Sequence, residues 1–144
     1  MKKFLPILLL ASACRTNTLT GKTETLRLHY IVWGCPCANW ATPEDLAKYE
    51  GDILAEHCIF IEPATQALAV PLYFDPARHG IIVTGQFYTK PGYPTGTVKT
   101  EEQLDKARVF RYNKISIFKK DIDYSPKDDT TGLKVLKNGP ARKH

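Results

Sequence analysis

Residues 108–118 read RVFRYNKISIF, and apolar and polar side chains alternate along this segment. Such alternation is typical of a half-buried strand, because successive side chains point to opposite faces. Phe110 and Tyr112 share one face of this strand, whereas Ile115 and Ile117 fall on the other. The change of phase predicts a β-bulge, or a strand that passes from one region of a sheet to another.

Three other segments have the composition of strands, and they cover residues 26–33, 58–61 and 81–88. β-Branched and aromatic residues, which favour strands, are frequent in all three. Gly85 lies where a bulge or a close approach of two backbones is expected. Residues 68–74 are a further candidate, which Pro71 restricts to a sheet edge or a bulge.

Thr42-Pro43-Glu44-Asp45 predicts the start of a helix. The threonine hydroxyl suits the N-cap, proline suits the first helical position, and carboxylates are favoured near the positive end of the helix dipole. This short helix is expected to run through Tyr49 and to end near Gly51, although residues 52–56 could continue it.

The fold class expected from these segments is mainly β: a small barrel or sandwich, OB-like or calycin-like, with one short helix. The chain of 144 residues is long enough for a single core. Its expected organisation is a signal segment over residues 1–13, a lipid-anchored tether over 14–24, one β-rich domain over 25–122 and a flexible C-terminal tail over 123–144.

The N-terminus has the order of a secretory signal. Lys2 and Lys3 precede an apolar run over residues 4–10, and small residues follow. The run is much shorter than the roughly 20 residues that a membrane-spanning helix needs. The sequence therefore predicts export from the cytoplasm.

The small residues before Cys14 resemble the lipobox of bacterial lipoproteins. The chain departs from that motif at Ala11, because the family prefers leucine three places before the cysteine. In this chain the leucine, Leu10, stands one place earlier. The resemblance implies that Cys14 becomes the acylated first residue of the mature chain; the alternative is a secreted protein with a free N-terminal cysteine. The residue after Cys14 is Arg15, which is not acidic, so retention at the inner membrane is not signalled. The expected location is therefore the cell envelope, at the outer membrane facing the periplasm.

In overall plan the chain resembles the small envelope lipoproteins of Bacteroidota. This likeness depends on the signal segment and on the size of the chain, and it carries over no active-site residue. The formal charge is +5, of which Lys2 and Lys3 account for two, which leaves +3 after cleavage. Acidic residues are interleaved throughout, so the charge does not indicate a nucleic-acid partner.

Three internal cysteines remain, namely Cys35, Cys37 and Cys58. We expect a structural disulfide between Cys58 and either Cys35 or Cys37, which would stabilise the fold by about 3 kcal/mol. Two alternatives use all three sulfurs: a site for a soft metal such as Cu(I) or Zn(II), or a thiol-redox centre. The one-residue gap between Cys35 and Cys37 differs from the two-residue gap of thioredoxin-like sites.

Four aromatic residues lie in or beside loops, where they are candidates for ligand binding: Trp33, Trp40, Tyr88 and Tyr93. For the two tryptophans, packing over the expected bridge is the favoured interpretation. The chain contains no phosphate-binding glycine loop, nucleophile elbow or HExxH motif.

These observations favour a non-enzymatic envelope lipoprotein that acts as a binding or structural module without a cofactor. Its expected partners are the membrane, through the N-terminal lipid, and a small ligand, a glycan or an envelope protein. The alternative is a periplasmic soft-metal or thiol-redox protein that uses Cys35, Cys37 and Cys58.

Overall fold

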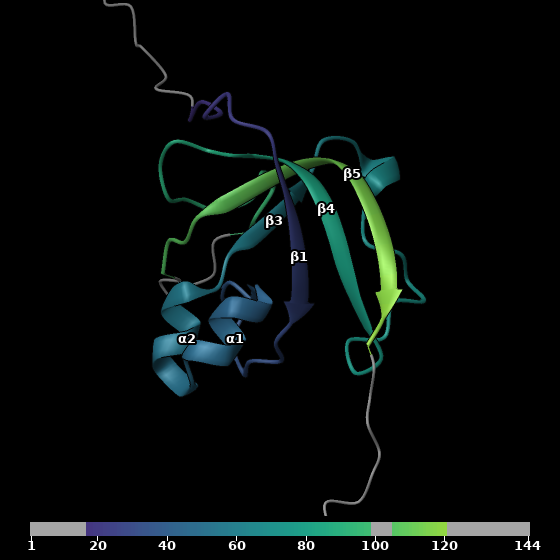
Figure 1. Ribbon diagram of the computed structural model, residues 1–144. Coiled ribbons are helices and arrows are strands. Elements are labelled where there is room, and N and C mark those ends of the chain that lie inside the picture. Colours follow the sequence, from purple (N-terminus) through teal and green to yellow (C-terminus); the bar gives the residue numbers. More distant parts are fainter. Residues whose placement is uncertain (1–16, 99–104, 121–144) are drawn as a thin grey trace, which may run out of the picture.

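The computed structural model describes residues 17–98 and 105–120. Its elements in chain order are β1 (Glu24–Tyr30), β2 (Trp40–Ala41), α1 (Pro43–Lys48), α2 (Gly51–His57), β3 (Phe60–Pro63), the 3-10 helix η1 (Gln66–Leu68), β4 (His79–Phe87) and β5 (Val109–Lys119). The five strands form one mixed sheet in the order β2-β1-β4-β5-β3, curled into a half-barrel (Figure 1). The expectation of a mainly β fold is confirmed.

The half-barrel is built on two antiparallel pairs, β1 with β4 and β4 with β5. β3 lies parallel to β5 at one edge, and the short β2 lies antiparallel to β1 at the other. The two edges meet where the Ile59 N–H donates to the Trp40 carbonyl at 2.9 Å and the Trp40 N–H donates to the Ile59 carbonyl at 3.3 Å. Curling therefore brings the first and last strands of the sheet together at this bridge.

The change of phase in β5 is a β-bulge, as the sequence predicts. Gly85 of β4 pairs with Tyr112, whereas the preceding Thr84 pairs with Lys114, so Asn113 is the extra residue. The bulge shifts the alternation of side chains along β5 by one residue. The apolar side chains on both sides of Asn113 consequently face the inside of the half-barrel, where they pack on the same core.

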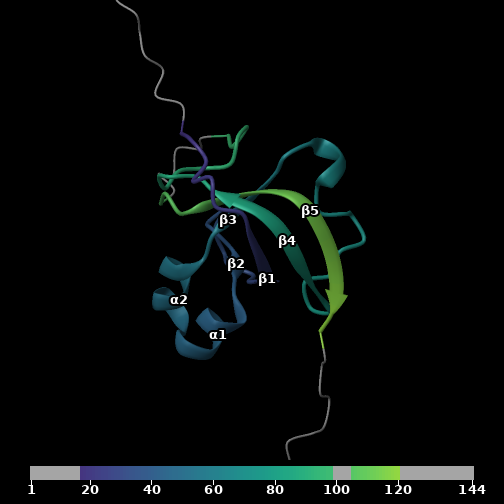
Figure 2. The same cartoon turned by 45° about the horizontal axis from the view of Figure 1, so that its top comes forward.

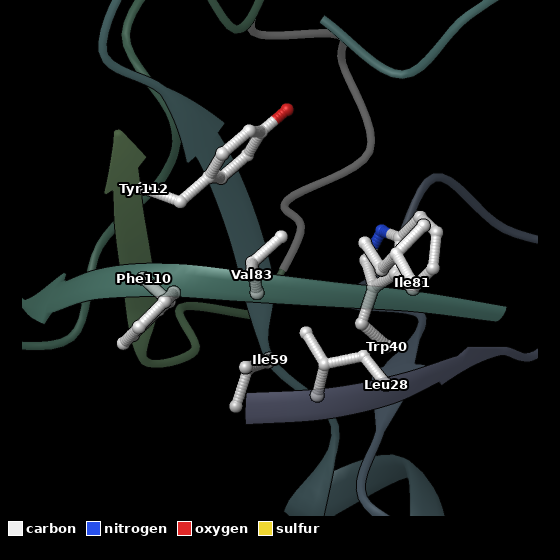
Figure 3. Packing of buried hydrophobic residues seen from close by; sticks show 7 residues of the cluster. All are labelled: Leu28, Trp40, Ile59, Ile81, Val83, Phe110 and Tyr112. Atoms are coloured by element: carbon white, nitrogen blue, oxygen red, sulfur yellow. The ribbon is translucent and has the colours of Figure 1, made fainter. Parts of the chain in front are cut away.

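The core fills the concave side of the sheet (Figure 3). Its buried members are Leu28, Trp40, Ile59, Ile81, Val83, Phe110 and Tyr112. The Tyr112 hydroxyl donates to the Leu68 carbonyl at 2.9 Å, which holds the segment after β3 against this core. Residues 68–74 form no strand, contrary to expectation: the 3-10 turn and Pro71 prevent pairing, while Phe74 packs into the core.

Two short helices follow β2 in place of the single helix expected. The Thr42 hydroxyl accepts from the Asp45 N–H at 3.1 Å, which confirms the predicted N-cap. Tyr49 and Glu50 are extended and separate α1 from α2. Both helices lie at the same side of the sheet in the two views (Figures 1 and 2). No helix in the described part of the chain is long and apolar enough to cross a membrane.

The helices cover a second apolar cluster on the outside of the half-barrel. Its buried members are Ala38, Ala41, Leu54, Cys58, Phe60 and Val109. The folded chain also begins earlier than residue 25, because the Thr20 N–H donates to the Phe87 carbonyl at 2.9 Å and the Thr89 N–H donates to the Thr18 carbonyl at 2.8 Å. The expected signal segment, Cys14 and the expected tail over 123–144 lie outside the described residues.

Candidate functional site

The convex side of the sheet over β1, β4 and β5 is here called the outer face. Strand pairing places the following side chains on it, because directly paired antiparallel residues point to the same side: Thr25, Arg27, His29, Ile82, Thr84, Lys114, Ser116 and Phe118. None of these side chains is acidic. The outer face therefore combines positive charge with half-buried apolar groups.

Phe118 lies at one end of the outer face, near the end of β5. It pairs with Gly80, and a Cβ on that glycine would lie 2.2 Å from the ring, so only glycine lets the ring settle against the strand. The guanidinium of Arg27 stacks on the ring, with its carbon 3.5 Å from the ring centroid. His29 meets the same ring edge-on, with centroids 5.5 Å apart. Stacking limits the motion of Arg27 while leaving its N–H groups free to bind an anion.

The positive charges on and beside this face affect the pKa of His29. Burial lowers the pKa of this imidazole, and the nearby charges of Lys120 and Arg27 lower it further. The Lys120 ammonium donates to the Pro76 carbonyl at 2.7 Å, which holds its charge beside the outer face. A negatively charged group placed here would relieve the repulsion among these cations.

The internal disulfide joins Cys35 to Cys37, with Cα atoms 5.3 Å apart, and Cys58 is a buried free thiol. The expected bridge from Cys58 to one member of the pair was therefore wrong. The chain bends over residues 34–37, which brings the two nearby sulfurs together. Cys58 instead lies in the apolar cluster beneath the helices, against which Trp33 also packs.

Burial raises the pKa of the Cys58 thiol, whereas the nearby indole of Trp33 opposes that shift. A buried thiol with a raised pKa forms little of the reactive thiolate. In protein carrying Cys14→Ser, we expect no thiol to react with a disulfide reagent under native conditions and one to react after denaturation without reductant. Cys58→Ser should abolish that signal. A thiol that reacts in the native state would contradict this pairing.

The alternative metal site is not assembled in this arrangement. Cys35 and Cys37 are bonded to each other, so neither offers a thiolate while the bridge is intact. Within residues 17–98 and 105–120, no group of three histidine, cysteine or acidic side chains is placed to hold a metal ion.

The predicted ligand-binding aromatics are divided between two interior regions. Trp40 is 5% exposed in the core, and Trp33 is half-buried with its ring N–H donating to the Ala38 carbonyl at 3.1 Å. Tyr93 packs against Phe60, with ring centroids 6.2 Å apart. Because these side chains are occupied by packing, they do not form one ligand surface.

Tyr88, the fourth predicted aromatic, belongs to a polar cluster around Glu62. The carboxylate of Glu62 is 7% exposed, and its Oε1 accepts from the Tyr88 hydroxyl at 2.8 Å. Its Oε2 accepts from the Thr95 N–H at 2.8 Å and from the Thr95 hydroxyl at 3.1 Å. The Arg111 Nε lies 3.8 Å from Oε1. Burial raises the pKa of Tyr88, and its bond to Glu62 adds to the shift.

The Glu62 cluster joins β3 to the loop that follows β4. Both carboxylate oxygens accept hydrogen bonds from that loop, so the group serves to anchor it. Acids elsewhere are also engaged locally: the Asp45 carboxylate accepts from the Thr42 hydroxyl at 2.8 Å at the cap of α1, and the Asp75 carboxylate accepts from the Ala77 N–H at 2.9 Å in the turn before β4. These contacts account for the acids as structural groups.

Sequence reasoning did not single out Arg27, His29 or Phe118 as a site. The period-2 pattern of residues 26–33 did mark Arg27 and His29 as partners on one face. Their meeting with Phe118 depends on the order β1-β4-β5, which no local pattern specifies. Comparisons of the chain with protein-family models, with curated proteins and with solved structures find no match.

Proposed function

We propose that this protein is a non-enzymatic binding module of the cell envelope whose outer face docks an acidic segment of another envelope protein. The observation that carries the proposal is an uncovered sheet face on which the cations of Arg27 and Lys114 occur without any acidic side chain. The proposal includes a lipid anchor at Cys14 that holds the module at the outer membrane, facing the periplasm.

The geometry of Arg27 supports carboxylates as the recognised groups. Its guanidinium is held flat on Phe118, and a planar fork of N–H donors matches a carboxylate in two parallel hydrogen bonds. A group already held in place loses less entropy on binding. Lys114 adds a second positive charge from the neighbouring region of β5.

The shape of the face supports a protein partner over a small molecule. Small ligands are bound in concave pockets, whereas the outer face is the convex side of three strands. Half-buried Ile82 and the hydroxyls of Thr25 and Thr84, whose oxygens are 2.9 Å apart, add apolar and polar contacts between the cations. Mixed apolar and polar surface of this kind is usual at protein interfaces.

The test measures binding of the purified protein to an immobilised glutamate-rich peptide. We expect saturable binding that weakens as salt rises to about 0.5 M, because salt screens exposed charges. The double variant Arg27→Ala/Lys114→Ala should bind roughly tenfold more weakly. Polygalacturonate and anionic vesicles serve as probes for an acidic glycan and a lipid surface.

The matched control is Lys90→Ala/Lys106→Ala, which removes two exposed lysines outside the outer face. It should leave peptide binding within about twofold of the original protein. Equal weakening by both double variants would show attraction to net charge alone and would contradict a specific outer-face site. Binding to polygalacturonate or vesicles but not to the peptide would contradict the choice of a protein partner.

A further inference from the structure

The bridge between Cys35 and Cys37 contributes less to the stability of the fold than a bridge between remote segments would. It encloses a single residue, Pro36, and a disulfide stabilises a protein mainly by closing a long loop in the unfolded chain. The loop between β1 and β2 has other ties: the Ile31 N–H donates to the Asn39 carbonyl at 2.8 Å, which joins its two ends. Structural stabilisation therefore gives no sufficient reason for this bridge.

The bridge is also accessible. Cys35 is exposed and Cys37 is half-buried, and the intervening Pro36 is exposed as well. Exposed disulfides are the labile ones, since a thiolate must reach a sulfur before exchange can begin. Val32, which is 78% exposed in the same loop, offers an apolar contact to an approaching polypeptide.

The third sulfur is kept apart from this exposed pair. Cys58 is buried in the cluster beneath the helices, against which Trp33 also packs. The ring N–H of Trp33 donates to the Ala38 carbonyl. These contacts hold the base of the loop in place whichever oxidation state the bridge has. The bridge between Cys35 and Cys37 can therefore be reduced and reformed without the thiol of Cys58 and without loss of the fold.

We propose that the Cys35–Cys37 bridge is a redox site that accepts electrons from pairs of thiols in exported polypeptides. This site is separate from the outer face, and it rests on the function proposed above only for the location of the protein outside the cytoplasm. The substrate class is a polypeptide with two cysteine thiols that are close enough to form a disulfide.

The exchange has two steps. A substrate thiolate attacks Sγ of the more exposed Cys35, the bond between Cys35 and Cys37 breaks, and Cys37 leaves as a thiolate. The second substrate thiolate then attacks the substrate sulfur of the mixed disulfide and releases Cys35. Two electrons and two protons pass to the protein, so one bridge is reduced to two thiols while one substrate disulfide forms.

The test follows this single transfer in protein carrying Cys14→Ser, with a synthetic peptide that contains two cysteine thiols. After alkylation, mass spectrometry should show the peptide oxidised and the protein carrying two new thiols. The rate should be at least roughly tenfold above that with the double variant Cys35→Ser/Cys37→Ser. Cys58→Ser is the matched control and should keep the rate, since its sulfur takes no part.

Two further measurements separate reactivity from folding. The thermal unfolding midpoint of Cys35→Ser/Cys37→Ser should lie within about 10 °C of that of the parent, because the bridge encloses only one residue. Cys37→Ser should form a covalent adduct with the oxidised peptide at Cys35, and Cys35→Ser should form less. Equal peptide oxidation by the parent and the double variant, or a bridge that survives excess reduced peptide, would overturn the proposal.

Discussion

Glu62→Ala should lower the free energy of unfolding by about 3 kcal/mol, because it removes a buried acceptor on which two segments converge. The Tyr88 hydroxyl and the Thr95 N–H would each lose the oxygen to which they donate at 2.8 Å. Arg111 would lose its partner too, but its side chain is 40% exposed, so water compensates for most of that loss. Chemical denaturation followed by tryptophan fluorescence measures the change.

The matched control for this prediction is Glu24→Ala. Glu24 pairs with Lys22, whose side chain is 79% exposed, so its removal should cost less than about 1 kcal/mol. Glu62→Gln keeps one oxygen acceptor and should fall between the two. An effect of Glu62→Ala no larger than that of Glu24→Ala would show that the loop after β4 is not anchored by this carboxylate.

Gly85→Ala should destabilise the protein by about 3 kcal/mol, because the bulge leaves no room for a side chain. A Cβ at this position would lie 2.1 Å from the Arg111 carbonyl oxygen and 2.6 Å from the Tyr112 Cα. Both neighbours are backbone atoms of β5, so relief requires the two central strands to separate. Chemical denaturation followed by tryptophan fluorescence measures the change in the free energy of unfolding.

Gly34→Ala is the control for that substitution. A Cβ on Gly34 would meet no atom within 4 Å, so we expect a change within about 0.5 kcal/mol. Similar melting curves for the two variants would mean that β4 and β5 tolerate a wider bulge. Loss of the folded state in Gly85→Ala alone would agree with a close backbone approach at this site.

Several features of the fold were predictable from neighbouring residues. The change of phase between Tyr112 and Ile115 indicates a bulge, and the structure has one at Asn113. Thr42 caps a helix because its hydroxyl, the following proline and the first-turn acids are all local signals. Such signals act over a few residues, so the rest of the fold hardly affects them.

The candidate sites were much less predictable. The three internal cysteines of a chain expected to be exported predicted a disulfide, but the choice of partners depended on the bend over residues 34–37 and on the burial of Cys58. Trp40 looked like a loop residue available to a ligand, whereas its bridge to Ile59 places it in the core. Glu62 lies just after the segment predicted as a strand over residues 58–61, yet it is buried within β3.

Alternation, capping residues and turn-forming glycines and prolines were enough to define a mainly β chain with its helix start and its bulge. Tertiary structure alone decided the strand order, and with it the stacking of Arg27 on Phe118 and the contact of Tyr88 with Glu62. The physical reason is distance along the chain. Local patterns report the preferences of adjacent residues, whereas a site requires side chains from remote segments to meet, and that meeting depends on how the whole sheet pairs and curls.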